Sequence, residues 1–190
     1  MREEFKLVSF ARSDQKQTDL SFLSLNQAEK VQQFHASFPM YQKTPLVSLP
    51  HIAQKLGLAA IYVKDESYRF GLNAFKVLGG SYAIGQHLAH RLQTDLSELP
   101  YEKLIAPETH KKLGDITFVT ATDGNHGRGV AWTANQLRQH SVVYMPKGSA
   151  AERLANIQAE GAEASITELN YDDAVRLANQ QANEKGWVMV

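Results

Sequence analysis

Thr122-Asp123-Gly124-Asn125-His126-Gly127-Arg128-Gly129 is a glycine-spaced segment that stands between an apolar run and a helix-periodic run. The residues before it, 116–121, are typical of a buried strand, and those after it, 126–139, have the spacing of a helix. Strands and helices that alternate with short links build parallel βαβ units with right-handed crossovers. We therefore predict an α/β fold on a parallel sheet, with further strands over 141–145, 164–167 and 187–190 and further helices over 150–160 and 171–184.

A second segment, Asn73-Ala74-Phe75-Lys76-Val77-Leu78-Gly79-Gly80, follows a polar loop and leads into a helix that we predict from near Ala74 to Leu92. Gly79, Gly80 and Gly85 each cost this helix about 1 kcal/mol relative to alanine. Such a cluster, joined by Ser81, indicates that another backbone or a ligand comes close to this helix.

Shorter elements are predicted on either side of this segment. Ser24 and Gln27 fit a capping box at the start of a helix that ends before Pro39. The residue before a proline is kept out of the helical region, so residues 44–47 should be extended. The remaining predicted elements are a helix over 51–56, a strand over 61–64 and a short helix at about 101–104. The first of these helices should end at Gly57, because glycine is common just after a helix.

The composition excludes several classes of protein. The chain has 190 residues, enough for one domain or slightly more, and its 43% hydrophobic and 21% charged residues are typical of a globular protein. Lys plus Arg equals Asp plus Glu, 20 against 20, so no net charge draws it to nucleic acid or to an anionic membrane. It has no cysteine, which excludes disulfides and thiolate metal sites. No secretory signal or membrane-spanning run is recognisable, so we expect a cytoplasmic location.

The last residues, Gly186 to Val190, have the pattern of a buried strand that follows a helix. A strand in this position normally leads into further elements of the sheet. We therefore expect the chain to be the front part of a longer protein.

Lys76 is the first candidate for chemistry. Most lysines are solvated surface residues, and that is the simplest interpretation of this one. Its neighbours Phe75, Val77 and Leu78 are apolar, however, and two glycines follow at once. An amine in apolar surroundings loses the solvation of its charged form, which favours the neutral and nucleophilic form. Lys76 therefore has the setting that an imine-forming lysine requires.

The loop at 122–129 offers complementary groups. As an ordinary strand-to-helix turn it would use its glycines to relieve crowding and Asp123 to cap the helix. A nucleotide loop is excluded, because the segment lacks G-x-G-x-x-G and the chain lacks G-x-x-x-x-G-K-[ST]. A helix N-terminus favours anions such as a carboxylate, and the Asn125 amide can donate to a phenolic oxygen on a pyridine ring. Together with Lys76, these groups suit an amino acid joined to pyridoxal phosphate.

Two longer segments carry a resemblance to a known family. They are KDESYRFGLNAFK, from Lys64 to Lys76, and ATDGNHGRGVAW, from Ala121 to Trp132. Ser37-Phe38-Pro39 and Thr44-Pro45-Leu46 add to it. With these segments the chain resembles the fold-type II pyridoxal phosphate enzymes and, among them, the diaminopropionate ammonia-lyases. The resemblance runs from about residue 20 to the end and implies an incomplete sheet of the tryptophan synthase β type.

The resemblance also implies roles for individual residues. Lys76 would hold the cofactor covalently, and Asn125 would contact its ring hydroxyl group. The substrate carboxylate would lie in the loop formed by Thr122, Asp123, Gly124 and His126. Related serine and threonine dehydratases usually have a small hydroxyl residue at the position of Asp123. In the ammonia-lyases the matching aspartate serves as base for the D-isomer of the substrate and the lysine for the L-isomer.

A carboxylate at position 123 also has an independent physical reason. The substrate 2,3-diaminopropionate carries a second amino group that leaves as ammonia. An anion nearby can attract that ammonium group or remove the α-proton, and the sequence leaves open which role dominates. The complete reaction would be β-elimination of ammonia, followed by hydrolysis to pyruvate and a second ammonia.

Other polar residues give weaker signals. His87 and His90 lie three apart on one predicted helix, but two ligands without a third do not make a zinc site, so no metal is predicted. His126 is either a general acid or a packed ring. Tyr68 and Arg69, in the polar loop before Lys76, reach either the active site or only the surface.

Two parts of the resembled site are not found in the sequence. In this family the cofactor phosphate and the pyridine nitrogen are held by the second half of a longer chain, and no glycine-rich phosphate loop occurs here. The resemblance divides the chain into residues 1–83, part of a large domain, and residues 84–190, a small α/β domain. Because residues 1–83 would lack their partners, we expect exposed apolar surface over residues 20–80.

Three functions therefore stay open. The first is pyridoxal phosphate-dependent elimination of ammonia from 2,3-diaminopropionate by a full-length enzyme, which we expect to be a homodimer. The second is a serine or threonine dehydratase, against which Asp123 argues. The third is a catalytically inert truncated product that binds the cofactor only weakly. Nucleic-acid and membrane partners are not expected, because the charge is balanced and no basic stripe occurs.

Overall fold

The computed structural model describes residues 8–9 and 19–190. Residues 1–7 and 10–18, at the beginning of the predicted 1–83 unit, lie outside the described residues. The order of elements in the described part is close to the predicted one. The elements are η1 (Ser21–Leu23), α1 (Leu25–Ala36), β1 (Leu46–Ser48), α2 (Pro50–Lys55), β2 (Tyr62–Lys64), η2 (Glu66–Gly71), α3 (Val77–Arg91), η3 (Leu96–Glu98), α4 (Tyr101–Leu104), α5 (Pro107–Leu113), β3 (Thr117–Ala121), α6 (Asn125–Gln136), β4 (His140–Met145), α7 (Ala151–Ala159), β5 (Glu163–Ile166), α8 (Tyr171–Lys185) and β6 (Val188–Met189).

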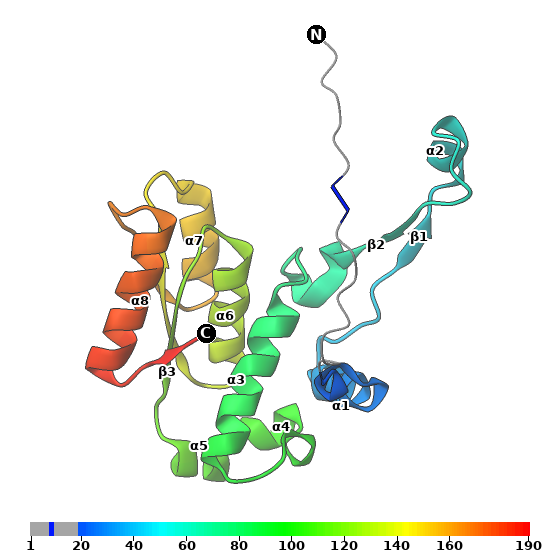
Figure 1. The fold of residues 1–190 in the computed structure, drawn as a ribbon. Helices are drawn as coiled ribbons and strands as arrows, with labels where there is room; N and C mark the ends of the chain where they lie inside the picture. Colours follow the sequence, from blue (N-terminus) through cyan, green and yellow to red (C-terminus); the bar gives the residue numbers. More distant parts are fainter. Residues whose placement is uncertain (1–7, 10–18) are drawn as a thin grey trace.

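Four parallel strands form the main sheet in the order β5-β4-β3-β6, which confirms the predicted α/β fold (Figure 1). The chain steps outward from β3 to β4 to β5 and then crosses back to β6, on the other side of β3. Because parallel crossovers are right-handed, helices of the outward and the return steps fall on opposite faces. Accordingly α6 and α7 cover one face, and α8 packs on β3 and β4 from the other.

The largest core lies where α1 and α3 meet α6. Its centre is aromatic: the ring of Trp132 lies 4.8 Å from that of Phe70 and 5.7 Å from that of Phe38, measured between centroids. Aromatic pairs at such separations add to the stabilisation that burial of their area gives. Trp132 therefore ties the first third of the described chain to the sheet.

β1 and β2 form an antiparallel pair with α2 between them, a pairing that the sequence did not predict. This arm, residues 46–64, stands away from the sheet and its helices (Figure 1). Apart from pairing with each other, the two strands have no substantial contacts with an element of the described chain. Both faces of the arm are therefore open to solvent.

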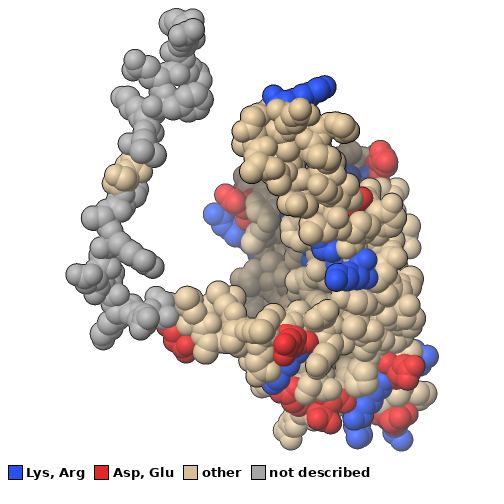
Figure 2. Space-filling view, turned by 90° about the vertical axis from the view of Figure 1, so that its right-hand side faces the viewer, with Lys and Arg blue, Asp and Glu red and all other residues tan. Residues whose placement is uncertain are grey.

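The predicted apolar surface over residues 20–80 is confirmed. Figure 2, which views this side of the molecule, shows broad areas that carry few charged side chains. Contiguous exposed apolar surface commonly marks a face that another protein segment or partner covers. The exposed large apolar side chains in this range are Leu20, Phe22, Leu23, Leu25, Met40, Leu46, Val47, Ile52, Leu56, Leu58, Tyr62, Val63, Tyr68 and Phe75.

The start of α3 differs from the prediction. The sequence predicts a helix from near Ala74, whereas α3 begins at Val77 with Lys76 as its N-cap. Asn73 lies in the left-handed region with φ at 58°, a conformation that asparagine tolerates but that no helix continues. The predicted division of the chain at residues 83 and 84 falls inside this helix and stays a prediction. Over residues 8–9 and 19–190, none of the helices has the length and hydrophobicity that crossing a bilayer requires.

Candidate functional site

The segments that contain Lys76 and Asn125 lie against each other. A Cβ atom at Gly129 would come within 2.8 Å of the Cα atom of Val77 and 3.0 Å of its nitrogen, a distance that real Cβ atoms do not reach. Glycine at this position therefore lets the first turn of α3 touch α6 directly. Because Lys76 immediately precedes Val77, its backbone is fixed close to the helix that begins at Asn125.

The predicted close approach along α3 is only partly confirmed. A Cβ atom at Gly85 would lie 2.7 Å from the ring of Phe34, and one at Gly80 would contact Val130 at 3.5 Å. Among the described residues no atom lies within 4 Å of a Cβ atom built at Gly79, so close packing in this part of the chain does not explain that glycine. The approach involves α1 and α6, which pack on α3 from two sides.

The loop between β3 and α6 is held by the sheet and by its own side chains. The backbone nitrogen of Thr122 donates to the carbonyl oxygen of Tyr144 at 3.0 Å, which continues the sheet pairing. The hydroxyl of the buried Thr122 accepts from the nitrogen of Gly124 at 3.1 Å. A Cβ atom at Gly127 would lie 2.2 Å from the methyl group of Thr122, so glycine is required there. Thr122 thus shapes the turn from inside.

Lys76 is exposed, which differs from the enclosed setting that the sequence predicted. Its neighbour Phe75 is 61% exposed, and Val77 is only 1% exposed because it points into the core. Val77 therefore anchors α3 instead of enclosing the amine, and Phe75 is exposed beside it. An apolar cover for the amine would have to come from outside the described residues.

The polar loop before Lys76 is held by a buried ion pair. The Arg69 guanidinium binds both carboxylate oxygens of Glu66, with distances of 2.8 and 3.0 Å, and donates to the Thr44 hydroxyl at 3.1 Å. Arg69 is 6% exposed, so it does not lie on the surface, which was one of the two outcomes considered from the sequence, and it lines a cavity together with His35. The hydrogen bonds from Arg69 hold the pKa of Glu66 below its usual range. Tyr68, by contrast, is half exposed.

Two left-handed residues shape the turn between this ion pair and Lys76. Phe70 has φ at 50° and Asn73 has φ at 58°. A bulky residue in this region is uncommon and costs of order 1–3 kcal/mol. The packing of the buried Phe70 ring against Trp132 offsets part of this cost. The chain therefore accepts local strain in the turn that leads to Lys76.

Asp123 is exposed and faces Arg153 of α7. The Nη1 atom of Arg153 lies 3.5 Å from Oδ2 of Asp123 and donates to its backbone carbonyl oxygen at 3.1 Å. Both side chains are more than half exposed, so this pair contributes little to stability. Gly124 rather than Asp123 is the N-cap of α6, and no side chain caps that helix. The carboxylate is therefore free of the capping role that an ordinary turn would give it.

Asn125 and His126 occupy the first turn of α6. Asn125 is exposed and borders a small pocket of about 50 Å³ between the starts of α6 and α7. His126 is half-buried, and its Nε2 atom lies 3.4 Å from the carbonyl oxygen of Val190. This geometry favours a packed, hydrogen-bonded ring for His126 over a general acid.

Arg128 is a residue of the site that sequence reasoning did not single out. Its Nε and Nη2 atoms lie 2.9 and 2.8 Å from a carboxylate oxygen of Glu160, and its Nη1 atom donates to the carbonyl oxygen of Leu72 at 3.3 Å. One side chain thus joins α6, the end of α7 and the loop before Lys76. The sequence signal for this role was the position of Arg128 between Gly127 and Gly129, in a segment that is otherwise closely packed.

The histidines on α3 do not form a metal centre in the described residues. The ring of His87 packs edge-on against Phe118 at 5.8 Å between centroids, and burial lowers its pKa. Within residues 8–9 and 19–190, no three side chains of the types that bind metals lie close enough to hold an ion.

Known proteins are similar to this chain in sequence. A model of the family described as "Pyridoxal-phosphate dependent enzyme" matches residues 38–190. A diaminopropionate ammonia-lyase from Salmonella typhimurium is 57% identical over 171 residues, which make up 90% of this chain and 42% of that protein. An L-threonine ammonia-lyase from Geobacter sulfurreducens is 28% identical over 149 residues, 78% of this chain and 31% of that protein.

A solved structure resembles the fold as well. The crystal structure of diaminopropionate ammonia lyase from Escherichia coli in complex with D-serine gives a TM-score of 0.84 at 50% identity, covering 92% of this chain and 43% of that one. The chain therefore spans about two fifths of the length of these ammonia-lyases. The family match, from residue 38 onward, includes both Lys76 and the loop from Thr122 to His126.

Proposed function

The chain belongs to the pyridoxal-phosphate dependent enzymes, and on this premise we propose that Lys76 and the loop from Thr122 to His126 form one side of a pyridoxal phosphate site. The observation that carries this proposal is the contact between Val77 and Gly129, which holds the lysine segment against the helix of the loop. This contact lies one residue after Lys76 in the sequence and four residues after Asn125, the first residue of α6.

The residues present fit the aldehyde and ring side of the cofactor. Lys76 supplies a primary amine for the aldehyde carbon, and the Asn125 amide supplies a donor for the ring hydroxyl group. The first turn of α6 supplies backbone N–H groups that no side chain caps, and these suit a carboxylate. The phosphate side is not represented, since the chain has no glycine-rich phosphate loop.

We further propose that the full-length protein eliminates ammonia from 2,3-diaminopropionate. Bound pyridoxal phosphate supplies an electron sink that makes the α-proton of an amino acid acidic. Lys76 then removes the α-proton of the L-isomer, and Asp123, on the loop before α6, removes that of the D-isomer. The N–H groups of the loop hold the substrate carboxylate. The products are pyruvate and two molecules of ammonia, with one water consumed.

The identity of residue 123 favours this reaction over that of a dehydratase. A substrate with a second ammonium group is attracted by a carboxylate, whereas serine and threonine carry a hydroxyl group that gains nothing from it. The much higher identity to a diaminopropionate ammonia-lyase than to a threonine ammonia-lyase supports the same choice. A substrate panel that includes both isomers of 2,3-diaminopropionate, serine and threonine distinguishes the two reactions.

The partners and location of the protein are also proposals. We propose a homodimer for the full-length protein, because the apolar surface of residues 20–75 needs cover that the described residues do not give. Charge balance speaks against nucleic acid as a partner. A cytoplasmic location suits a chain without cysteine, which gains nothing from an oxidising compartment.

Cofactor binding by this chain is tested with pyridoxal phosphate and borohydride. Mixing should give an absorbance band near the edge of the visible range, and reduction should fix the pyridoxyl group on the Lys76 peptide, as located by mass spectrometry. Lys76→Ala should remove both signals, whereas Lys55→Ala, at an exposed lysine of α2, should keep them. Labelling spread evenly over the exposed lysines would support the catalytically inert alternative.

Catalysis is tested in a chimera in which this chain replaces the matching segment of the Salmonella typhimurium relative. The chimera should release pyruvate from 2,3-diaminopropionate, and Lys76→Ala should abolish that release. A folded, cofactor-loaded chimera that acts on threonine but not on diaminopropionate would overturn the substrate assignment.

A further inference from the structure

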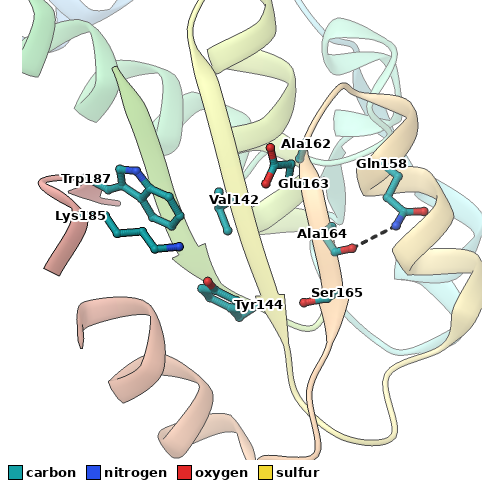
Figure 3. Close-up of a pocket in the computed structure, with 9 residues that line it drawn as sticks. All are labelled: Val142, Tyr144, Gln158, Ala162, Glu163, Ala164, Ser165, Lys185 and Trp187. Atoms are coloured by element: carbon teal, nitrogen blue, oxygen red, sulfur yellow. Dashed lines mark hydrogen bonds between the residues drawn. The ribbon is translucent and has the colours of Figure 1, made fainter. Parts of the chain in front are cut away.

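A hollow on the face of the sheet that α8 covers lies apart from the proposed site (Figure 3). Its volume is about 520 Å³, within the range of roughly 300–1,000 Å³ that is usual for small-molecule sites. None of its lining residues belongs to the lysine segment or to the loop from Thr122 to Gly129. The lining residues are Val142, Tyr144, Gln158, Ala162, Glu163, Ala164, Ser165, Lys185 and Trp187.

The topology of the sheet creates this hollow. Only one helix, α8, returns across this face in the described chain, and it packs on β3 and β4 but not closely on β5. Val142 is paired with Glu163 and Tyr144 with Ser165, and alternate residues of a strand share one face. These four side chains therefore form a surface beside α8 that no other helix or strand of the described residues packs on closely.

The end of α8 adds the remaining wall. Gly186 ends the helix in the left-handed conformation, with φ at 69°, and the chain then turns so that Trp187 lies beside Lys185. The ammonium group of Lys185 lies 4.3 Å from the centroid of the Trp187 ring. Figure 3 shows these two residues on one side of Val142 and Glu163 on the other.

The hollow therefore carries one positive and one negative group across an apolar floor. Neither Lys185 nor Glu163 takes part in an ion pair within the described part of the chain. Tyr144 and Trp187 present half-buried aromatic surface between them. Burial and the nearby Glu163 raise the pKa of Tyr144, so its hydroxyl stays a neutral donor.

We propose that this hollow binds a free α-amino acid with an aromatic side chain, at a site separate from the proposed pyridoxal phosphate site. The carboxylate of the ligand pairs with Lys185 and its ammonium group pairs with Glu163. Its ring lies on Val142, Tyr144 and Trp187.

Opposite charges on one carbon atom are what distinguish this ligand from others. A simple anion is attracted by Lys185 but repelled by Glu163, and a simple cation is attracted by Glu163 but repelled by Lys185. A neutral aromatic molecule covers the floor but removes water from both charged groups without replacing it. A free amino acid satisfies both groups and places its side chain on the aromatic floor.

The test uses L-phenylalanine and two analogues that each lack one charge, 3-phenylpropionate and 2-phenylethylamine. Binding is followed by NMR through the indole N–H signals, of which the chain has two. Trp132 is buried in the core and serves as an internal reference, whereas Trp187 lines the hollow. Phenylalanine should shift the Trp187 signal with a dissociation constant on the order of 1 mM, which suits a ligand of this size. Each analogue should bind about tenfold more weakly or worse.

Variants assign the two charges. Glu163→Gln should reduce the affinity for phenylalanine to that for 3-phenylpropionate, and Lys185→Gln should reduce it to that for 2-phenylethylamine. Glu29→Gln and Lys55→Gln, at exposed positions of α1 and α2, should change neither. An unchanged Trp132 signal in each variant shows that the fold is kept.

Three results would overturn the proposal. They are a Trp187 signal that phenylalanine leaves in place, equal binding of all three compounds, and loss of discrimination in the control variants as well. None of these results bears on Lys76, so the pyridoxal phosphate proposal stands or falls separately.

Discussion

Acidification should destabilise the folded chain through His35. This ring is 3% exposed, and its Nε2 atom lies 3.0 Å from the carbonyl oxygen of Leu78 and 2.9 Å from the hydroxyl oxygen of Ser81. Burial is the main cause that lowers the pKa of His35, to about 4, with the charge of Arg69 acting in the same direction and the hydrogen bond to Leu78 opposing it. The cavity beside the ring is also lined by Lys43 and Lys64, which disfavour a further positive charge.

The sign and size of the effect follow from proton linkage. The unfolded chain protonates His35 below about pH 6.5, whereas the folded chain does so only near pH 4. Between these values the unfolded state binds more protons, so the free energy of unfolding falls as the pH falls. At about 1.4 kcal/mol for each pKa unit the full effect is roughly 3 kcal/mol, of which about 2 kcal/mol is lost by about pH 5.

The assay is urea unfolding of the wild type and of His35→Gln at a series of pH values. Other groups also titrate, Glu66 among them, but they cancel in the difference between the two proteins. The stability of His35→Gln relative to the wild type should rise by about 2 kcal/mol between neutral pH and about pH 5. His51→Gln, at an exposed histidine of α2, should follow the wild type. A constant difference between His35→Gln and the wild type across this range would refute the reasoning.

Three further predictions concern the glycine contact, the buried ion pair and the proposed base. Gly129→Ala should destabilise the chain by about 1–3 kcal/mol in urea unfolding, because the added Cβ atom meets the backbone of Val77. Gly79→Ala should stabilise it by up to about 1 kcal/mol, because no described residue lies within 4 Å of the added Cβ atom. Equal effects of the two variants would contradict the packing argument. Glu66→Gln should cost about 3 kcal/mol, because it leaves the buried guanidinium of Arg69 without its carboxylate, and the double variant Glu66→Leu/Arg69→Met should cost less. In the chimera, Asp123→Asn should lower turnover of the D-isomer far more than that of the L-isomer, and equal losses would remove the base assignment.

The fold of the second half could be predicted from the sequence because local and global signals agree there. The segment from Thr117 to Met189 alternates apolar strands with amphipathic helices, and each βαβ unit has one favoured hand. The antiparallel pairing of β1 with β2 could not be predicted, because their strands are short and α2 separates them in the sequence. Pairing between such strands depends on tertiary contacts that periodicity does not encode.

The packing between the two segments was more predictable than the surroundings of Lys76. The glycines at 127 and 129 indicated crowding in the turn. In the structure a Cβ atom at Gly127 would overlap Thr122, and one at Gly129 would overlap Val77. Val77 and Leu78 do not enclose the Lys76 amine, because Val77 lies in the core between α3 and α6 and Leu78 packs against that core. Apolar residues beside a lysine in the sequence therefore do not by themselves tell whether they cover the amine or the helix beneath it.

The exposure of Lys76 and the apolar surface of residues 20–75 have one physical explanation. The exposed apolar side chains concentrate around the arm and the lysine turn, whereas residues 84–190 expose only Ile166, Tyr171 and Met189 among their large apolar side chains. One part of the described chain is thus closed and the other is open, and Lys76 lies at the boundary between them. Desolvation or a neighbouring cation favours the neutral, nucleophilic form of a lysine amine. Residues 19–190 therefore encode where the amine is held, while its reactivity depends on the surface that comes to cover the open part.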